Sequence, residues 1–503
     1  MSTRKPSPRD RALRPRPEDL ETRQLLSTVL RGIDIDGDTY TLRMKGPGDV
    51  RIVNQLGSDG EPIPLGSAAE IDRITVGGTN PELSTLVGRV QQGPDGDGTV
   101  FFKRLEAFAN QSPQVPSGNG LQAIDMPGFR LGNTSPAGTS AAGSPPASIS
   151  IPSGVGSLRL GGVDASRGTT PGVAPAGAQD DTVSITLGLP RMGGTRIVLD
   201  QVISSTQPTA ATGGQPAGVV QHGVVFNVSG RLSLFQADSI VGDPDTPGGQ
   251  FPGGGGTVVT SLPDPNTRIT GQIGDVRVGG DATNFSVLTN DKLANFFIGG
   301  ETRSVFLLTP TGSRNLHFGK GLDTVTINTH SVEHLQANRG AQSSSITANR
   351  GLGRLRFGGD VANSTFLSGY PQDLASALSS QSVTADPSAQ SGGFMNVLVA
   401  GDVTDTVFAA SVEPSEGEFG TPDDLLLPQG QITAKVEGTI DNAEATPQSP
   451  DTAFFARSVD LEKGPVTPPD VPELPFPGPK RPVHFPGIGG PSRGRSTGQR
   501  RSS

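Results

Sequence analysis

The sequence predicts an all-β fold, a parallel β-helix (β-solenoid) with coils of about 20 residues, and three observations lead to this prediction. Gly (70) and Pro (44) are abundant among 503 residues, while only 33% of residues are hydrophobic and 5% aromatic. A single large globular core is hard to build from such a composition, whereas a stack of coils buries only a few small β-branched residues per coil. An apolar triplet followed by Gly also recurs at a nearly constant spacing.

The repeat is clearest over residues 270–445, where apolar and other residues alternate in each triplet, as expected of a half-buried strand. The spacings between the Gly turns are about 20, 20, 20, 19, 42 and 37 residues, which is typical of a solenoid. The two long spacings contain inserted polar stretches, 369–392 and 411–430, which should emerge on one side of the stack. The triplets are 276–278, 296–298, 316–318, 335–337, 355–357, 397–399 and 434–436.

Each repeat contains a second strand, and a small polar residue precedes it in most repeats. The Gly pair after the triplet is expected to supply a positive-φ corner, and the polar side chains to form a hydrogen-bonded ladder along one turn. Parallel crossovers favour a right-handed coil. The second strands include 285–288, 305–308, 325–327, 345–347, 365–367 and 407–409. The polar column is Asn284, Ser304, Ser344, Asn363, Asp405 and Asn442.

Residues 31–269 form an irregular β-rich region. Residues 39–44 and 49–53 flank a Gly/Pro loop and predict a β-hairpin. Triplets before a Gly pair at 74–76 and 158–160 indicate that irregular coils begin well before residue 270. Low-complexity stretches cannot bury enough apolar surface to order themselves, so they are expected to be long disordered loops leaving the solenoid. These stretches are 132–156, 163–180, 205–218 and 241–265.

The two ends of the chain are basic and the body is acidic. Residues 1–17 carry a net charge of +5 and residues 475–503 a net charge of +6, although the whole chain has −9. Basic ends are typical of contact with an anionic polymer, membrane or wall, and equally of solvated disordered tails. Residues 446–503, rich in Pro, Gly and Arg, predict an extended disordered tail.

Residues 1–30 contain a candidate targeting segment. Leu20, Glu21, Arg23, Leu25, Leu26 and Ser27 fit the pattern L-E-x-R-x-L-L-S after an Arg/Pro-rich start. This segment resembles the LEPR-XLL export segment of large planctomycete extracellular proteins, which has Pro where this chain has Thr22. The resemblance covers about 15 residues and implies export. Read physically, Asp19–Leu30 predicts a short amphipathic helix with Asp19 as its N-cap.

The first candidate for chemistry is an acidic stretch that resembles the start of a Ca²⁺ loop. Asp34, Asp36 and Asp38 alternate with other residues, but an EF-hand would need Gly and Glu where this chain has Thr39 and Lys45. The EF-hand interpretation therefore fails, and either a looser, low-affinity ion site or an acidic turn remains. No Cys is present to form disulfides, Cys–zinc sites or a thiol nucleophile.

Stacked carboxylates and histidines are further candidates. Acidic residues follow the Gly turn in several coils and can either bind Ca²⁺ or, more simply, form turn hydrogen bonds. They are Asp281, Glu301, Asp360 and Asp402. His330 and His334 stand four apart but lack the H-E-x-x-H pattern of zinc enzymes. Two charged pairs at i, i+2 spacing, Asp275 with Arg277 and Arg354 with Arg356, fit the solvent face of a strand.

These observations predict an exported, cell-surface or extracellular structural or adhesive protein without catalytic activity, with no catalytic, cofactor-binding or metal residues and no cofactor. Trp is absent and only two Tyr are present, so platforms for sugar stacking are scarce, and the acidic body disfavours nucleic acid as a partner. No apolar run is long enough for a membrane helix. The partner, an unknown surface polymer or protein, stays open. The alternatives are a β-helix enzyme acting on polysaccharide and a Ca²⁺-dependent surface module.

Overall fold

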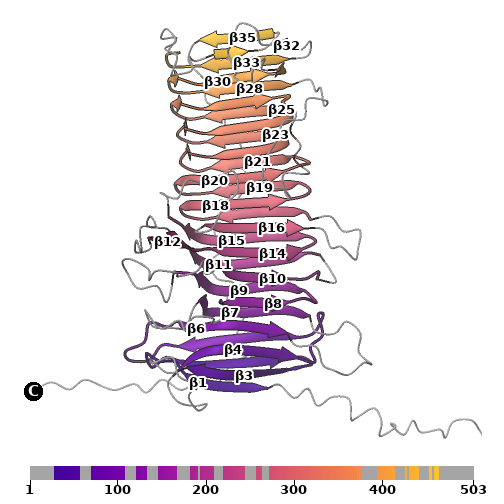
Figure 1. Cartoon of the computed structure of the whole chain (residues 1–503), viewed down its shortest axis with the longest axis vertical. Coiled ribbons are helices and arrows are strands. Elements are labelled where there is room, and N and C mark those ends of the chain that lie inside the picture. Colours follow the sequence, from indigo (N-terminus) through magenta and orange to yellow (C-terminus); the bar gives the residue numbers. More distant parts are fainter. Residues whose placement is uncertain are drawn as a thin grey trace, which may run out of the picture. The chain divides into compact units, whose positions relative to one another are not determined.

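The computed structural model describes an all-β chain in which successive strands stack into a β-solenoid (Figure 1). All described residues belong to one compact unit, Met1–Pro465. The described residues are 28–56, 69–107, 120–132, 146–166, 182–190, 193–208, 219–243, 256–262, 271–370, 372, 374, 393–413, 425–426, 430–440, 453–455 and 458–463.

Each coil has three sides, which we name face A, face B and face C in chain order. The two strands predicted for each repeat of residues 270–445 lie on faces A and C, and face B is a shorter third side. Face A contains the apolar triplets other than 74–76, which lies on face C. Its strands are β5 (Thr85–Gln91), β17 (Ile273–Val278), β19 (Leu293–Ile298), β21 (Ser313–Phe318), β28 (Phe394–Val399), β33 (Gln431–Val436) and β35 (Ser458–Lys463). Four strands run from face A into face B: β7 (Leu121–Gly132), β9 (Val155–Asp164), β11 (Thr195–Ile203) and β15 (Leu232–Val241).

Faces B and C complete each coil. Face B is otherwise made of short strands, β22 (Leu322–Asp323), β24 (Ala341–Gln342), β26 (Val361–Ala362) and β29 (Val403–Thr404). Three strands connect face B to face C: β6 (Val100–Ala107), β18 (Ala282–Thr289) and β20 (Thr302–Thr309). Face C contains β4 (Glu70–Gly77), β8 (Ser148–Ile151), β10 (Val183–Leu187), β14 (Val224–Ser229), β16 (Thr257–Leu262), β27 (Thr365–Ser368), β30 (Val407–Ala410) and β34 (Ala453–Phe455). Two strands continue from face C into face A, β23 (Thr326–Ala337) and β25 (Ser345–Phe357).

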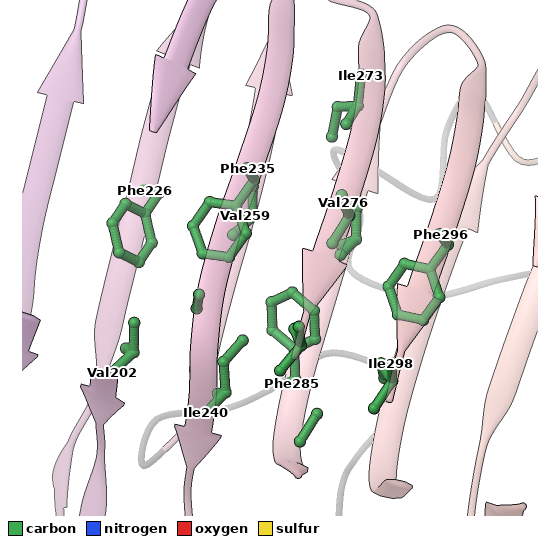
Figure 2. Packing of buried hydrophobic residues seen from close by; sticks show 14 of the residues in the cluster. Val202, Phe226, Phe235, Ile240, Val259, Ile273, Val276, Phe285, Phe296 and Ile298 are labelled. Carbon is green, nitrogen blue, oxygen red and sulfur yellow. The ribbon is translucent and has the colours of Figure 1, made fainter. Parts of the chain in front are cut away.

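The interior is a continuous file of apolar side chains, because alternate residues of the stacked strands point inward. Phenylalanines stack from coil to coil, and Figure 2 shows Phe226, Phe235, Phe285 and Phe296 in this file. The ring centroids of Phe235 and Phe285 lie 6.1 Å apart, and those of Phe285 and Phe296 lie 6.2 Å apart. Such pairs add about 0.5–1.5 kcal/mol each beyond the burial of their area. The predicted repetitive core is therefore confirmed, but the expectation that small β-branched residues fill it is wrong, because phenylalanines occupy its centre.

The Gly turns after the triplets form one column, as the repeat predicts. The backbone N–H of Gly299 donates to the carbonyl oxygen of Val278 at 2.9 Å, and that of Gly319 donates to Ile298 at 2.6 Å. The column contains Gly279, Gly299, Gly319, Asn338, Gly358, Ala400 and Glu437. None of its glycines has a φ in the left-handed region, so the predicted positive-φ Gly corner is wrong. Gly is favoured because the coils approach closely: a β-carbon at Gly299 would overlap the carbonyl oxygen of Gly279.

The left-handed corner lies instead between faces B and C, at the predicted polar column. Its residues have φ between 46° and 55°, a region that Asn and Asp tolerate better than other side chains. They are Asn284, Ser304, Thr324, Ser343, Asn363 and Asp405. The predicted Ser344 is displaced by one position, because Ser343 takes the left-handed conformation. Asn442 lies outside the described residues.

Hydrogen bonds between coils at this corner come from the residue after the left-handed one. The hydroxyl of Ser344 donates to the carbonyl oxygen of Gln342 at 2.9 Å and accepts the backbone N–H of Val325 at 3.2 Å. The hydroxyl of Ser364 likewise donates to Ala362 within its own coil at 2.7 Å and accepts the backbone N–H of Ser344 in the preceding coil at 3.2 Å. These side chains are buried, so the bonds satisfy polar groups that would otherwise be costly to enclose. The expected polar ladder therefore exists, but one residue further along the chain.

The first coil is covered by antiparallel strands β1 (Val29–Ile33), β2 (Thr39–Lys45) and β3 (Asp49–Leu56). β2 pairs with β1 and β5, whereas β3 pairs with β4. The predicted hairpin is therefore wrong in its pairing, although both of its strands exist, because each strand finds a different edge of the first coil. The helix predicted for residues 19–30 is also wrong at its C-terminal end, because Val29 and Leu30 lie in β1. Residues 19–27 lie outside the described residues. Such a cap satisfies the open edge of a stack.

The ladder extends into regions where loops or a tail were predicted. β8 and β16 lie in the low-complexity stretches 132–156 and 241–265 and pair in parallel with their neighbours on face C. Residues 205–208 form β12, which pairs antiparallel with β13 (Val219–His222). β34 and β35 pair with β30 and β33, so the solenoid continues past residue 445 to Lys463. Composition alone misplaced these strands, and most of the other residues of these stretches and of the tail lie outside the described residues.

Both insertions leave the solenoid at the end of face C, as predicted, because β27 and β30 are neighbours in register. In the second insertion, β31 (Val412–Glu413) and β32 (Leu425–Leu426) form a short antiparallel pair. The first insertion turns back over face C. There Leu374 packs against Phe306 and Leu308, and Gln372 exchanges hydrogen bonds of 2.9 and 3.0 Å with Asn349. The described start of this insertion therefore covers face C.

Candidate functional site

The predicted acidic stretch forms a compact loop between β1 and β2 that meets a second loop, residues 92–99. One carboxylate oxygen from each of Asp36, Asp38 and Asp97 lies within 4.8 Å of the other two. Asp38 is fully buried, and its two oxygens accept three backbone N–H groups, from Gly93 at 2.7 Å, from Gly98 at 2.6 Å and from Thr99 at 3.0 Å. The Asp38 carboxylate thus fixes the second loop against the first.

This arrangement is first of all a loop clamp. Asp34 contributes through its backbone, because its N–H donates to the carbonyl oxygen of Asp38 at 2.7 Å. Asp36 accepts the backbone N–H of Asp97 at 3.2 Å. Carboxylate oxygens are also ligands that Ca²⁺ prefers, and the exposed carboxylate of Asp97 leaves the outer side of the cluster open to solvent. Because Thr39–Lys45 is strand β2, the EF-hand interpretation is again ruled out.

The predicted column of acidic residues forms coil-to-coil hydrogen bonds. The carboxylate of Asp281 accepts the backbone N–H of Glu301 at 2.7 Å, and that of Asp360 accepts the N–H of Asp402 at 2.9 Å. Asp402 accepts both the N–H and the hydroxyl of Thr439, at 2.7 and 2.8 Å, and these bonds hold the pKa of Asp402 below its usual value. The geometry therefore supports the turn interpretation of this column.

The predicted pair of histidines does not form a site, whereas the predicted pair of Asp275 and Arg277 makes direct contact. His330 and His334 both lie in β23, on either side of the bend from face C to face A, and they do not converge on one point. Burial lowers the pKa of His330, with a smaller effect of the Arg350 charge. Asp275 and Arg277 do form an ion pair, at 2.7 Å, on the outer side of face A.

A carboxylate pair that sequence reasoning missed lies on adjacent coils. Asp200 in β11 stands beside Asp238 in β15, because their neighbours Leu199 and Ala237 are in register. Both side chains are exposed, yet surrounding protein raises the pKa of Asp200, and the charge of Asp238 raises it further. Arg159 and Arg130 oppose this shift. The signal in the sequence would have been two Asp residues at the same position after an apolar triplet.

Sequence reasoning also missed Asp97, because it lies about sixty residues from its partners. It missed as well a largely buried ion pair of 2.8 Å between Asp72 and Arg104. No family model, curated protein or solved structure matches the chain. Within the part of the chain that the structure describes, no helix is long and apolar enough to cross a membrane.

Proposed function

We propose that this chain is an exported structural or adhesive protein of a cell surface or extracellular matrix, without catalytic activity. The resemblance of residues 20–27 to the planctomycete LEPR-XLL segment supports export. A repetitive scaffold supports the structural role, because a solenoid presents the same surface positions at regular intervals.

One observation carries the structural role: the polar groups at the coil corners form coil-to-coil hydrogen bonds. Asp281, Asp360 and Asp402 each accept a donor from the following coil. Ser344 accepts a donor from the coil before it. Such ladders add specificity to a stack whose interior is simple and apolar. A rigid, regularly spaced surface is what an adhesive or matrix protein requires.

Fractionation of the native cell tests the export proposal. An antibody raised against the solenoid should detect the protein in the envelope or medium fraction, and on intact cells before permeabilisation. Cytosolic enzymes serve as the matched control for lysis. Recovery of the protein with that cytosolic control, and labelling only after permeabilisation, would contradict export.

A second candidate function, cleavage of a polysaccharide, is favoured by the Asp200 and Asp238 pair. Glycosidases use two carboxyl groups, one of which has a raised pKa and acts as a general acid. The direction of the Asp200 shift fits that role. Incubation of the purified chain with neutral and acidic polysaccharides, followed by measurement of reducing ends, tests it. Release that persists in the Asp200→Asn variant would show that the pair is not responsible.

A further inference from the structure

The coils of residues 292–356 form a basic region within an acidic protein when all three faces are counted, and the face A strands contribute Arg314, Glu333, Arg354 and Arg356 to it. Residues 292–356 contain eight Lys or Arg and three Asp or Glu, a net charge of +5, whereas the whole chain carries −9. This segment spans β19 to β25, in which successive coils follow each other without long insertions. A local excess of positive charge on a negative molecule attracts anions to one place.

The outward residues of face A in this region form two straight columns. Register places Asn295, Asn315, His334 and Arg354 in one column. It places Phe297, His317, Gln336 and Arg356 in the other. Neighbouring rungs are about 4.8 Å apart. We call these eight side chains the face A strip.

Contacts along the strip hold its lower rungs in place. The amide nitrogen of Asn315 donates to the amide oxygen of Asn295 at 2.8 Å, and Asn295 donates to Asp275 at 2.7 Å. In the other column the rings of Phe297 and His317 stack with centroids 5.2 Å apart and planes 12° from parallel. Side chains that are already ordered lose little entropy when a ligand binds.

The upper rungs supply cations that are not neutralised. Among the described residues, neither Arg354 nor Arg356 forms an ion pair, whereas Arg277 pairs with Asp275 at 2.7 Å and Arg314 pairs with Glu333 at 3.5 Å. Guanidinium groups bind carboxylate or sulfate through paired hydrogen bonds. Above these rungs, Leu398 follows Arg356 in one column and Asn396 follows Arg354 in the other.

A small hollow adjoins the strip where face C turns into face A. It has a volume of about 120 Å³ and is lined by charged and hydroxyl side chains. Among them are Lys292, Arg314, Ser331 and Glu333. A small pendant group, such as a carboxylate, of a polymer that lies on the strip can enter this hollow.

We propose that the face A strip binds an extended acidic polysaccharide, whose chain runs along the stack and crosses one rung about every 4.8 Å. Arg354 and Arg356 contact its acidic groups, and the Asn and Gln amides contact its hydroxyls. A single-stranded nucleic acid fits less well, because it needs free aromatic faces for its bases, and the rings of Phe297 and His317 face each other. This inference rests on the proposed surface role, for which it names the partner.

Binding of the purified full chain to polygalacturonate, with dextran and single-stranded DNA as comparison polymers, tests the proposal. We expect binding of polygalacturonate that weakens with salt, no binding of dextran, and weaker binding of DNA. The double variant Arg354→Gln with Arg356→Gln should weaken polygalacturonate binding by at least about 10-fold. The matched control, Arg31→Gln with Arg43→Gln, removes the same charge from exposed positions on β1 and β2 and should change binding by less than about 2-fold. Circular dichroism checks that both variants fold.

Three results would overturn the proposal. The first is an equal loss of binding in the two double variants, since net charge alone would then explain it. The second is binding of DNA as strong as that of polygalacturonate, which would assign the strip to a different polymer. The third is no binding of polygalacturonate by the unaltered chain at low salt. Because the purified chain is used, none of these results bears on export, which the fractionation experiment decides separately.

Discussion

Two glycines at equivalent positions of neighbouring coils should respond in opposite ways to the same substitution. Gly279 and Gly299 both follow a face A triplet, and neither has a φ in the left-handed region, so their backbones accept alanine. A β-carbon on Gly279 would lie 3.6 Å from the nearest atom, the carbonyl oxygen of Asp238, which is ordinary contact. A β-carbon on Gly299 would overlap the carbonyl oxygen of Gly279 and lie 3.2 Å from its carbonyl carbon.

The expected energies follow from these contacts. Gly279→Ala should stabilise the fold by about 0.4–1 kcal/mol, because alanine restricts the unfolded chain. Gly299→Ala gains the same term but must displace backbone in a stacked sheet, an overlap that costs about 1–3 kcal/mol. Ala400 occupies the same column with its own β-carbon, so the corner can adapt, which limits the cost to this range. The two variants should therefore differ by about 1–3 kcal/mol.

Hydrogen exchange measures this difference locally, which suits a repeat protein whose unfolding need not be two-state. In Gly299→Ala, amides of β19 and β21 should exchange about 5- to 150-fold faster than in Gly279→Ala, while amides of the distant β5 should not change. Equal exchange rates in the two variants would refute the argument that close approach of the coils selects glycine at this corner.

Four further outcomes are expected. Phe366→Ala should destabilise the fold by about 3–5 kcal/mol in urea unfolding, because Phe366 is fully buried and stacks 4.9 Å from Phe408, whereas the exposed Phe394→Ala should change stability by less than about 0.5 kcal/mol. Asp38→Asn should destabilise the fold by about 1–3 kcal/mol and so lower the melting temperature, because an amide nitrogen would face backbone N–H donors. A chelator should leave the melting temperature of the unaltered chain unchanged. The lowered pKa of Asp402 gives stability above its ordinary pKa that is lost as pH falls through the folded pKa, so Asp402→Asn should reduce the loss of melting temperature below about pH 4. The raised pKa of Asp200 has the opposite effect, because its contribution to stability is lost as pH rises through the folded pKa. Asp200→Asn should therefore raise the melting temperature slightly at pH 7 and leave it unchanged at pH 3.

The strands of face A could be predicted because each carries its own evidence. In Leu355–Phe357 two inward apolar residues flank an outward one, and Gly follows, so alternation and turn chemistry agree. Face B could not be predicted in the same way. Strands such as Val361–Ala362 have two residues, and two residues cannot show a period; neighbouring coils determine their pairing.

The candidate site was predictable only in part, for a related reason. The loop of Asp36 and Asp38 was visible as a local acidic pattern, but Asp97 reaches it through the pairing of β2 with β5. The error in the predicted hairpin has the same origin, because a Gly/Pro loop indicates a reversal but does not specify which edge each strand will join. The low-complexity stretches misled in another way, since β16 is six residues long and averaging over residues 241–265 hides it.

The length of a coil varies far more than the geometry of the ladder. Leu232 pairs with Ile273 across 41 residues, Ile273 pairs with Leu293 across 20, and Gly351 pairs with Phe394 across 43. Doubling the length of a flexible loop costs only about 0.6 kcal/mol of closure entropy, so insertions at corners are tolerated while each face keeps its register. Hydrogen bonding and inward packing act only on the strands, and selection for the stack therefore does not constrain the spacing between them. This explains why the repeat is regular in sequence only over the coils that lack insertions, although the parallel ladder extends from β4 to β35.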